Sequence, residues 1–314
     1  MKDRYGREIN YLRLSVTERC TLRCVYCRSD EGMCPKAEEL SAKQLVEITK
    51  ACTELGIAKV RITGGEPLLR RDLTEIISGI KAIDQIVDIS LTTNAQDLTA
   101  QAQKLKDAGL NRLNISMDSL KPTRFEALTG GNLQKVLDGI EAALMVGLTP
   151  LKVNCVLMKD VNDDEIDDFI NLTREKPVDV RFIEYMPIGE NGAGRVRINN
   201  QDILSSRPEL KPIKPRYAGQ PSRDYFIEGY KGRVGLISPI SHQFCEDCNR
   251  IRVMSDGTLR ACLGDESEVS LKTALAQGHR EIRDLIETTI FNKPRGHKFE
   301  CAPLKERNMS RIGG

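Results

Sequence analysis

The sequence predicts an α/β protein whose main part is an incomplete (βα)6 barrel, similar to a TIM barrel but open on one side. From about residue 11 to residue 186, short apolar runs alternate with amphipathic segments. Alternation at this spacing is typical of βα units built around a parallel sheet. Polar residues also recur at the ends of successive apolar runs, which is where barrel enzymes place their active sites. A doubly wound open sheet is the competing architecture.

Strands and helices are expected to alternate through this part of the chain. The strands are expected at residues 11–16, 58–63, 87–92, 112–117, 152–157 and 179–185. The helical patterns lie at residues 41–55, 72–82, 98–108, 133–146 and 163–173. Ser41 and Asp72 are suitable N-caps, while Gly56, Gly109 and Gly147 follow three of the helices as C-cap signals.

The pattern changes after Met186. Residues 187–235 are rich in Pro, Gly, Asn and Arg, which predicts loops with one helix near residues 200–205. The later elements are expected to be short strands within 234–263, helices near 270–277 and 280–289, and a flexible basic tail at 305–314. We therefore divide the chain into a barrel, residues 1–186, and a C-terminal extension, residues 187–314.

The composition is that of an ordinary globular protein, with 40% hydrophobic and 29% charged residues among 314. We find no apolar run that could span a bilayer and no signal peptide at the start, so a cytoplasmic location is expected. The net charge of +2 gives no reason to expect binding to nucleic acid or to a membrane. Any anionic substrate must therefore be bound by a local group of cations.

Ten cysteines without an export signal indicate metal ligands or free thiols rather than a disulfide framework. Four of them are scattered and are expected to be small buried side chains or bystanders. These four are Cys34, Cys52, Cys155 and Cys301. The other six form two compact groups, which we call the first and the second triplet.

The first triplet is Cys20, Cys24 and Cys27, in the run CTLRCVYC directly after the first expected strand. A [4Fe–4S] cluster usually takes four thiolates, so three leave one iron open to a ligand that is not protein. An open metal position is typical of a catalytic site. A zinc site or a set of reduced thiols is the alternative. Tyr26, between the last two cysteines, is expected to cover a cluster ligand.

The second signature is RITGGEPLLRRDL, which follows the second expected strand. The adjacent Gly64 and Gly65 allow a ligand to approach the backbone closely, and Glu66 could accept hydrogen bonds from a cationic amino group. A tight strand-to-helix turn is the alternative. Further polar residues at strand ends indicate a ligand-lined edge. They are Thr92, Thr93, Asn94, Ser116, Asp118, Lys152, Asn154, Arg181 and Glu184.

The second triplet is Cys245, Cys248 and Cys262, again without an obvious fourth thiolate. His242 could complete a zinc site instead. Arg250 and Arg252 alternate, so on a strand they share one face and suit a phosphate or a carboxylate.

The remaining residues of interest are Arg13 and two histidines. Arg13, in the first strand, needs an anionic partner if it points inward. His279 and His297 are expected to be surface residues.

The run CTLRCVYC together with RITGGEPLLRRDL resembles the radical S-adenosylmethionine superfamily. The later run CEDCNRIRVMSDGTLRACL, the strand RFIEYM and the terminal Gly-Gly are similar to the GTP 3′,8-cyclase family of molybdenum cofactor biosynthesis. The resemblance extends from Arg13 to Gly314. Two alternatives stay open: another radical S-adenosylmethionine enzyme, such as a peptide-modifying maturase, and a redox or zinc-ribbon protein without catalysis.

The resemblance implies two [4Fe–4S] clusters, one on each triplet, and S-adenosylmethionine on the open iron of the first. The contacts implied for S-adenosylmethionine are Tyr26, Gly65, Ser116 and Met186. The contacts implied for GTP are Arg13, Arg61, Thr92, Lys152, Arg250 and Arg252. The open iron of the second cluster is implied to bind the guanine edge, so the C-terminal extension carries part of the active site.

The reaction implied by the resemblance begins with a 5′-deoxyadenosyl radical, which abstracts the ribose 3′ hydrogen of GTP. The C3′ radical then attacks C8 of guanine and yields (8S)-3′,8-cyclo-7,8-dihydroguanosine 5′-triphosphate. A catalytic role is implied for Arg250, Arg252 and the tail residues Gly313 and Gly314. The implied partners are a low-potential electron donor and cyclic pyranopterin monophosphate synthase as the downstream enzyme, with the chain a monomer or a homodimer.

The sequence departs from the family pattern at two places. The common TTNG becomes Thr92-Thr93-Asn94-Ala95, which matters only if position 95 needs a positive φ. The usual glycine before the Asn162-Asp163 pair is also replaced. Neither change falls on a matched ligand position.

Overall fold

The computed structural model describes residues 1–27, 38–188, 197–297 and 299. The tail residues Gly313 and Gly314, and the cysteines Cys34 and Cys301, lie outside the described residues. Within these ranges, no helix combines the length and the apolar character needed to cross a membrane.

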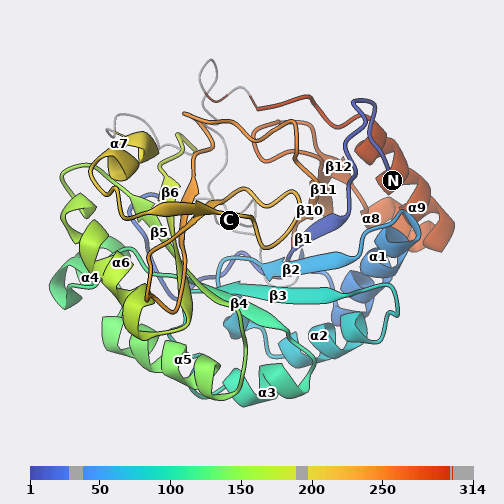
Figure 1. The fold of residues 1–314 in the computed structure, drawn as a ribbon. Helices are drawn as coiled ribbons and strands as arrows, with labels where there is room; N and C mark the ends of the chain where they lie inside the picture. Colours follow the sequence, from blue (N-terminus) through green and yellow to red (C-terminus); the bar gives the residue numbers. More distant parts are fainter. Residues whose placement is uncertain (28–37, 189–196, 298, 300–314) are drawn as a thin grey trace.

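One curved sheet forms the centre of the protein, and the helices of the first half cover its outer face (Figure 1). Its first six strands are β1 (Tyr11–Ser15), β2 (Lys59–Thr63), β3 (Asp88–Thr93), β4 (Arg112–Ser116), β5 (Leu151–Leu157) and β6 (Val178–Glu184). The covering helices are α1 (Ala42–Glu54), α2 (Leu73–Lys81), α3 (Ala102–Asp107), α4 (Pro122–Thr129), α5 (Leu133–Met145) and α6 (Ile166–Glu175). Short 3-10 turns, η2 (Pro67–Leu69) and η3 (Asp163–Glu165), complete the first half.

The second half adds strands to both edges of the sheet. These strands are β7 (Lys211–Ile213), β8 (Arg223–Phe226), β9 (Val234–Ile237), β10 (Arg250–Val253), β11 (Thr258–Arg260) and β12 (Val269–Ser270). The helices of this half are α7 (Asn200–Ser205), α8 (Lys272–Gln277) and α9 (His279–Phe291). The prediction of loops over residues 187–235 is therefore wrong for β7, β8 and the start of β9.

The strand order is β12-β11-β10-β1-β2-β3-β4-β5-β6-β9-β8-β7. All pairs from β10 through β1 to β6 and β9 are parallel, and the outer pairs are antiparallel. Within the described ranges, β7 and β12 are the two edges and do not pair, so the barrel stays open. The predicted α/β fold of mostly parallel strands is confirmed. The consecutive order β1 to β6 excludes the doubly wound alternative, in which the order reverses at a switch point. The domain division at residue 186 stays a prediction.

Alternation along the strands separates an apolar face from a polar one. In β1, Leu12 and Leu14 are fully buried in the core beneath the helices, whereas Arg13 lies on the opposite face. Burying a side chain such as leucine contributes about 1.5–3 kcal/mol. The outer layer therefore stabilises the barrel and leaves the inner face for polar residues.

Local signals at the helix ends are mostly confirmed. Ser41 forms a capping box with Gln44, and Gly56, Gly109 and Gly147 all have positive φ after their helices. The prediction for Asp72 is wrong in detail. It occupies the N-cap of α2, but its carboxylate binds the Arg70 guanidinium at 2.8 and 2.7 Å and makes no capping hydrogen bond.

Helix α4 was missed because its sequence carries little periodicity. It begins with Pro122, ends before Gly130 in a left-handed conformation, and buries only Phe125, Leu128 and Thr129. Eight residues with so few apolar side chains do not show a helical stripe.

Both departures from the family pattern include a residue with positive φ. Ala95 has a φ of 61° and Asp160 a φ of 58°. The left-handed region costs a residue with a Cβ about 1–2 kcal/mol. Ala95 is also fully buried, and its backbone oxygen lies close to Gly139 of α5.

We expect Ala95→Gly to leave the free energy of unfolding within about 1 kcal/mol of the parent. Relief of the backbone strain is offset by loss of a buried methyl group, about 0.8 kcal/mol, and by the added freedom of glycine when unfolded. Chemical denaturation measures the difference. The matched control is Ala143→Gly, in α5 and fully buried, which should cost about 2 kcal/mol because no strain is relieved. Equal losses in both variants would contradict the strain at position 95.

Candidate functional site

A cavity inside the curved sheet brings together residues from both halves of the chain. It is lined by nearly all of the predicted site residues that the structure describes. These are Arg13, Cys20, Cys24, Tyr26, Cys27, Arg61, Gly65, Thr92, Ser116, Met186, Cys245, Cys248, Arg250, Arg252 and Cys262. Among the described contacts implied for the clusters, S-adenosylmethionine and GTP, Lys152 is the exception, although Asn154 and Val156 on the same face of β5 do line the cavity. Glu184, also expected at this edge, does not line the cavity either, and its Oε2 accepts hydrogen bonds from the Ile240 and Ser241 N–H groups at 2.9 and 3.0 Å.

The first triplet occupies the loop after β1, at the carboxyl end of the strand. Cys20 Sγ accepts hydrogen bonds from the Leu22 N–H at 3.4 Å and from Asn94 Nδ2 at 3.7 Å. Burial raises the pKa of Cys24 well above its usual range, aided by the nearby Asp118 carboxylate. A metal cation that binds such a thiol displaces its proton and stabilises the thiolate, so this setting suits a metal ligand.

The two glycines after β2 let the chain pass very close to the segment before the first triplet. A Cβ on Gly65 would lie 2.3 Å from the Arg19 carbonyl oxygen, so only glycine fits. The Gly65 N–H donates to the Thr17 oxygen at 2.7 Å. The glycines therefore hold the loop of the first triplet against the end of β2.

The Glu66 carboxylate is occupied by hydrogen bonds from other residues of the protein. It accepts hydrogen bonds from Thr93 Oγ1 and the Asn94 N–H, each at 2.7 Å, and from the Leu68 N–H at 3.0 Å. Burial outweighs these donors and raises the pKa of Glu66 to about 7. Glu66 therefore ties the turn after β2 to the end of β3, rather than lining the cavity.

Tyr26, inside the first triplet, is held by a buried carboxylate. Its hydroxyl donates to Asp118 Oδ2 at 2.5 Å, and its ring meets Tyr185 edge-on at 6.5 Å. The other Asp118 oxygen accepts from the Val156 N–H at 2.8 Å. Burial raises the pKa of Asp118 to about 6. The end of β4 thus sets the position of the loop that carries Cys24 and Cys27.

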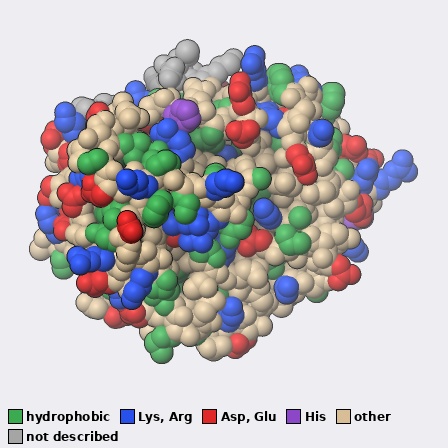
Figure 2. Space-filling model, viewed as in Figure 1, with side chains coloured by type: hydrophobic (Ala, Val, Ile, Leu, Met, Phe, Trp, Pro, Cys, Tyr) green, Lys and Arg blue, Asp and Glu red, His purple; other side chains and the backbone are tan. Residues whose placement is uncertain are grey.

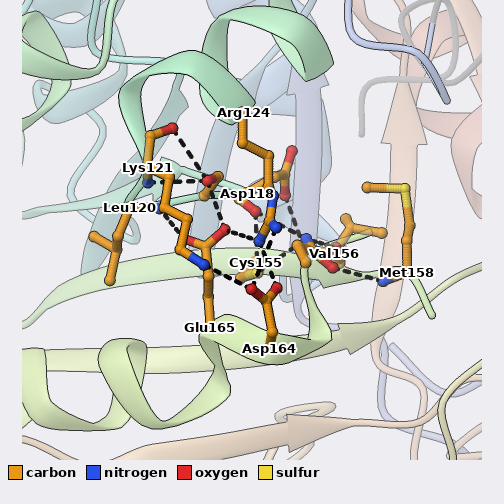
Figure 3. Close-up of polar contacts among 11 residues, drawn as sticks. Asp118, Leu120, Lys121, Arg124, Cys155, Val156, Met158, Asp164 and Glu165 are labelled. Atoms are coloured by element: carbon orange, nitrogen blue, oxygen red, sulfur yellow. Dashed lines mark hydrogen bonds and ion pairs between the residues drawn. The ribbon is translucent and has the colours of Figure 1, made fainter. Parts of the chain in front are cut away.

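A buried network anchors the loop that follows Asp118 (Figure 3). Glu165, which is fully buried, accepts hydrogen bonds from Ser119 Oγ at 2.7 Å, the Leu120 N–H at 2.6 Å and Arg124 Nη1 at 2.6 Å. Asn162 donates to the Asp118 carbonyl oxygen at 2.8 Å. The turn after β5 therefore fixes the turn after β4, and through Asp118 it supports Tyr26.

The second triplet lies at the opposite end of the strands. Cys245 and Cys248 precede β10, whose first residue Arg250 is level with Tyr11, the first residue of β1. The first triplet follows the last residue of β1, Ser15. Four steps along a parallel strand span about 13 Å, which is the length of β1 between the strand ends where the two triplets are attached. The cavity runs between them.

The arrangement of the triplets fits clusters better than single ions. Among the described residues, no three His, Cys, Asp or Glu side chains converge closely enough to hold one metal ion. In a cubane each cysteine binds a different iron, so the three sulfurs stand further apart than around one zinc. All three cysteines of the second triplet line the cavity, whereas His242 is not among its lining residues, and this does not favour the zinc alternative with His242. Burial raises the pKa of Cys248, but the charges of Arg250 and Lys293 outweigh it and lower that pKa to about 6.

A row of guanidinium groups crosses the inner face between the triplets. In the sheet register Arg13 is level with Arg252 on one side and with Arg61 on the other. Like charges on neighbouring strands repel one another. Burial, together with this repulsion, holds the pKa of Arg13 well below its usual range and lowers that of Arg252 to about 9.

More cations continue this surface on the strands opposite. Burial and the neighbouring Arg181 and Arg112 lower the pKa of Lys152 to about 6, and burial lowers that of Arg181 to about 10. Arg61 Nε has no hydrogen-bond partner in the part of the chain that the structure describes. Such a concentration of buried positive charge favours an anion with several negative groups. Figure 2 also shows Lys and Arg side chains gathered near the middle of one face.

Sequence reasoning missed several contributors to this site. Arg112 pairs with Asp88 at 2.5 Å and faces the Tyr217 ring, which also faces Lys152 and Lys59 at 5.1 and 5.3 Å. The strand alternation could have revealed Arg112, but nothing local marks Tyr217, which comes from the connection between β7 and β8.

The prediction for His297 is wrong. It lines the cavity, its Nε2 donates to the Pro239 oxygen at 2.8 Å, and its ring stacks on Phe299. His279 instead contacts Glu47 and Glu54 outside this cavity. Cys52 and Cys155 are fully buried, as expected.

Comparison with known proteins identifies the family. The model of the radical SAM superfamily matches residues 14–173, and that of Molybdenum Cofactor Synthesis C matches residues 178–299. A GTP 3′,8-cyclase of Alkaliphilus oremlandii is 47% identical, and one of Listeria monocytogenes serotype 4b is 45% identical. Each alignment covers 100% of this chain, with 100% and 99% of the relatives. The chain belongs to the GTP 3′,8-cyclase family.

Solved structures agree with this family at the level of the fold. Streptococcus suis SuiB has a TM-score of 0.64 at 14% identity, covering 91% of this chain and 66% of that one. Native anSMEcpe with bound AdoMet has a TM-score of 0.56 at 14% identity, covering 97% and 93%. Membership in the GTP 3′,8-cyclase family implies a radical SAM enzyme with a [4Fe–4S] cluster and S-adenosylmethionine as cofactors.

We expect Glu165→Ala to lower the free energy of unfolding by about 3 kcal/mol. The change leaves the Leu120 N–H without its acceptor and leaves the Ser119 hydroxyl only its longer contact with the Lys121 oxygen at 3.3 Å. A buried donor that loses its acceptor costs about 1–3 kcal/mol. Chemical denaturation measures the loss. Asp164→Ala is the matched control, because Asp164 is the neighbouring acid but is half exposed and should change stability little. Similar losses in the two variants would show that the buried network does not anchor this loop.

Proposed function

We propose that this chain is a GTP 3′,8-cyclase that converts GTP to (8S)-3′,8-cyclo-7,8-dihydroguanosine 5′-triphosphate, the first step of molybdenum cofactor biosynthesis. The observation that carries the proposal is the single cavity with a cysteine triplet at each end and a row of buried cations between them. One end suits radical generation, the other suits binding of the base, and the cations suit a triphosphate.

Cys20, Cys24 and Cys27 would hold the first [4Fe–4S] cluster, with S-adenosylmethionine completing it. When bound, these groups supply a 5′-deoxyadenosyl radical for abstraction of the ribose 3′ hydrogen. Tyr26, Gly65, Ser116 and Met186 line this end of the cavity and would contact S-adenosylmethionine. The contribution of these residues is to orient the cofactor and to exclude water.

Cys245, Cys248 and Cys262 would hold the second [4Fe–4S] cluster, which leaves one position for the guanine edge. Binding the base here and the phosphates along the strands would direct the ribose toward the first triplet. A GTP molecule is long enough to extend between two ends separated by the length of β1.

The triphosphate would lie against the cations of the inner face. The implied contacts Arg13, Arg61, Arg250 and Arg252, together with Thr92 and Lys152, come from five different strands. We add Arg181, which lines the same cavity on β6. A bound polyphosphate would replace repulsion among these groups with charge-assisted hydrogen bonds. The catalytic roles proposed for Arg250 and Arg252 rest on this contact.

The proposed function also involves tail residues outside the described ranges and other proteins. Gly313 and Gly314 are proposed to reach the active site. A low-potential electron donor would reduce the first cluster, and cyclic pyranopterin monophosphate synthase would use the product. A cytoplasmic location and a monomer or homodimer also stay predictions.

Anaerobic reconstitution followed by incubation with GTP, S-adenosylmethionine and a reductant tests the proposed function. We expect about eight irons per chain, since each cubane holds four, and formation of both 5′-deoxyadenosine and a cyclic product from GTP. Mass spectrometry identifies the products. Release of 5′-deoxyadenosine without a GTP-derived product would contradict the substrate, and four or fewer irons with bound zinc would contradict the second cluster.

The variant Cys245→Ala separates the two ends of the cavity. It should keep S-adenosylmethionine binding and the irons of the first cluster but lose formation of the cyclic product. Cys52→Ala is the control, because Cys52 is buried in the core away from the cavity. Equal activity in Cys245→Ala and the parent would show that the second triplet has no part in the reaction.

GTP binding should weaken as pH rises. The pKa of Lys152 is lowered to about 6 without ligand, so its amine is mostly neutral at about pH 8. A triphosphate favours the charged amine, and binding therefore takes up a proton. Affinity should fall by up to about tenfold per pH unit above the ligand-free pKa. Calorimetry between about pH 7.5 and about pH 9, in buffers with different heats of ionisation, measures both effects.

Lys152→Arg provides the control for this pH dependence, because an arginine holds its proton far more strongly than a lysine in the same surroundings. We expect the variant to bind GTP with a flatter pH profile and less proton uptake. The same slope in the parent and in Lys152→Arg would exclude Lys152 as the group that titrates.

A further inference from the structure

Lys293, directly beyond the C-terminal end of α9, is almost completely buried, with 1% of its surface exposed. Its Nζ donates to the carbonyl oxygen of Arg250 at 2.8 Å and to that of Ala261. Arg250 lies two residues after Cys248, and Ala261 directly precedes Cys262. One ammonium group therefore joins the two chain segments that carry these cysteines.

A second buried cation holds the remaining cysteine of the second triplet. Arg7 pairs with the buried Asp3 at 2.7 Å. It donates to the Cys245 carbonyl oxygen at 2.8 Å and to those of Pro294 and Arg295 at 2.6 and 2.9 Å. The segment after Lys293 is thereby fixed beside Cys245. Cys245 and the segments that carry Cys248 and Cys262 are thus held by two cations other than the arginines of the row, and Lys293 itself lines the cavity.

The charge of Lys293 has no carboxylate to balance it among its hydrogen-bond partners in the described residues, because both partners are backbone carbonyls. Burial lowers the pKa of Lys293, and the nearby Cys248 and Cys262 oppose that shift. A buried ammonium is costly unless an anion lies near it. Three thiolates and a cubane form such an anion, and its negative charge grows by one when the cluster takes up an electron.

We propose that Lys293 is a positioning residue of the second cluster. It holds the Cys248 and Cys262 segments at a fixed separation, and its buried charge stabilises the reduced cluster. The role rests on the proposed function in one respect, which is the presence of the second cluster. Lys293 lies outside both triplets. Neither the spacing of the cysteines nor the contacts implied for GTP indicates a role for it.

The test uses the full chain with Cys20→Ala, Cys24→Ala and Cys27→Ala, so that the second cluster alone is present. Lys293→Met, Lys293→Gln and Lys293→Arg are added to this background one at a time. Arg280→Met is the matched control, since Arg280 lies on α9 with 87% of its side chain exposed. The readouts are iron per chain after anaerobic reconstitution and the midpoint potential of the cluster, followed by electron paramagnetic resonance.

We expect Lys293→Met to lose most of its iron or to keep a cluster whose potential is more negative than the parent's, because a nearby positive charge is gone. Lys293→Arg should restore the iron content and most of the potential. Lys293→Gln keeps hydrogen-bond donors but carries no charge. Its iron content should therefore come closer to the parent's than its midpoint potential does. Arg280→Met should match the parent in both.

Parent-like iron and potential in Lys293→Met would overturn the proposal. Loss of the cooperative thermal transition in both Lys293→Met and Lys293→Gln would also overturn it, because Lys293 would then serve the fold as a whole. A background chain that holds no iron would show instead that the second-cluster assignment fails, and the role of Lys293 with it. The two failures are therefore distinguishable.

Discussion

The parallel pairing of β10 with β1 is the constraint on which the site depends. It joins the last quarter of the chain to its first strand and places Arg250 and Arg252 level with Tyr11 and Arg13. Because the first triplet follows β1 and two cysteines of the second triplet precede β10, the same pairing sends the triplets to opposite ends of one cavity. A slip of one residue would turn both arginines to the other face of the sheet.

The inner face of the barrel is arranged for a ligand that brings negative charge. Burial and the neighbouring cations lower the pKa values of Arg13, Arg61, Arg181, Arg252 and Lys152. This arrangement opposes folding of the chain without a bound ligand, since burying each cation costs free energy when no anion lies near it. The apolar layer between the sheet and the helices compensates for it. A protein built this way gains stability when a polyphosphate binds, by the linkage between binding and folding.

The sequence predicted the features that local signals determine. Strand ends were placed within about two residues because period-2 alternation and glycine caps act locally, as at Gly56 and Gly109. The two triplets and the shared face of Arg250 and Arg252 also follow from spacing. Residues that act across long sequence separations were missed. Arg7, Lys293 and Tyr217 contact the site from segments with no motif, and β7 and β8 are too short and polar to show alternation.

The central claim is that GTP lies between the triplets with its ribose 3′ carbon facing the first one. Incubation with GTP carrying deuterium at C3′ tests it directly, with mass spectrometry of the 5′-deoxyadenosine that is released. We expect deuterium to appear in 5′-deoxyadenosine in step with formation of the cyclic product. Release of unlabelled 5′-deoxyadenosine while GTP is converted would contradict this placement of the substrate.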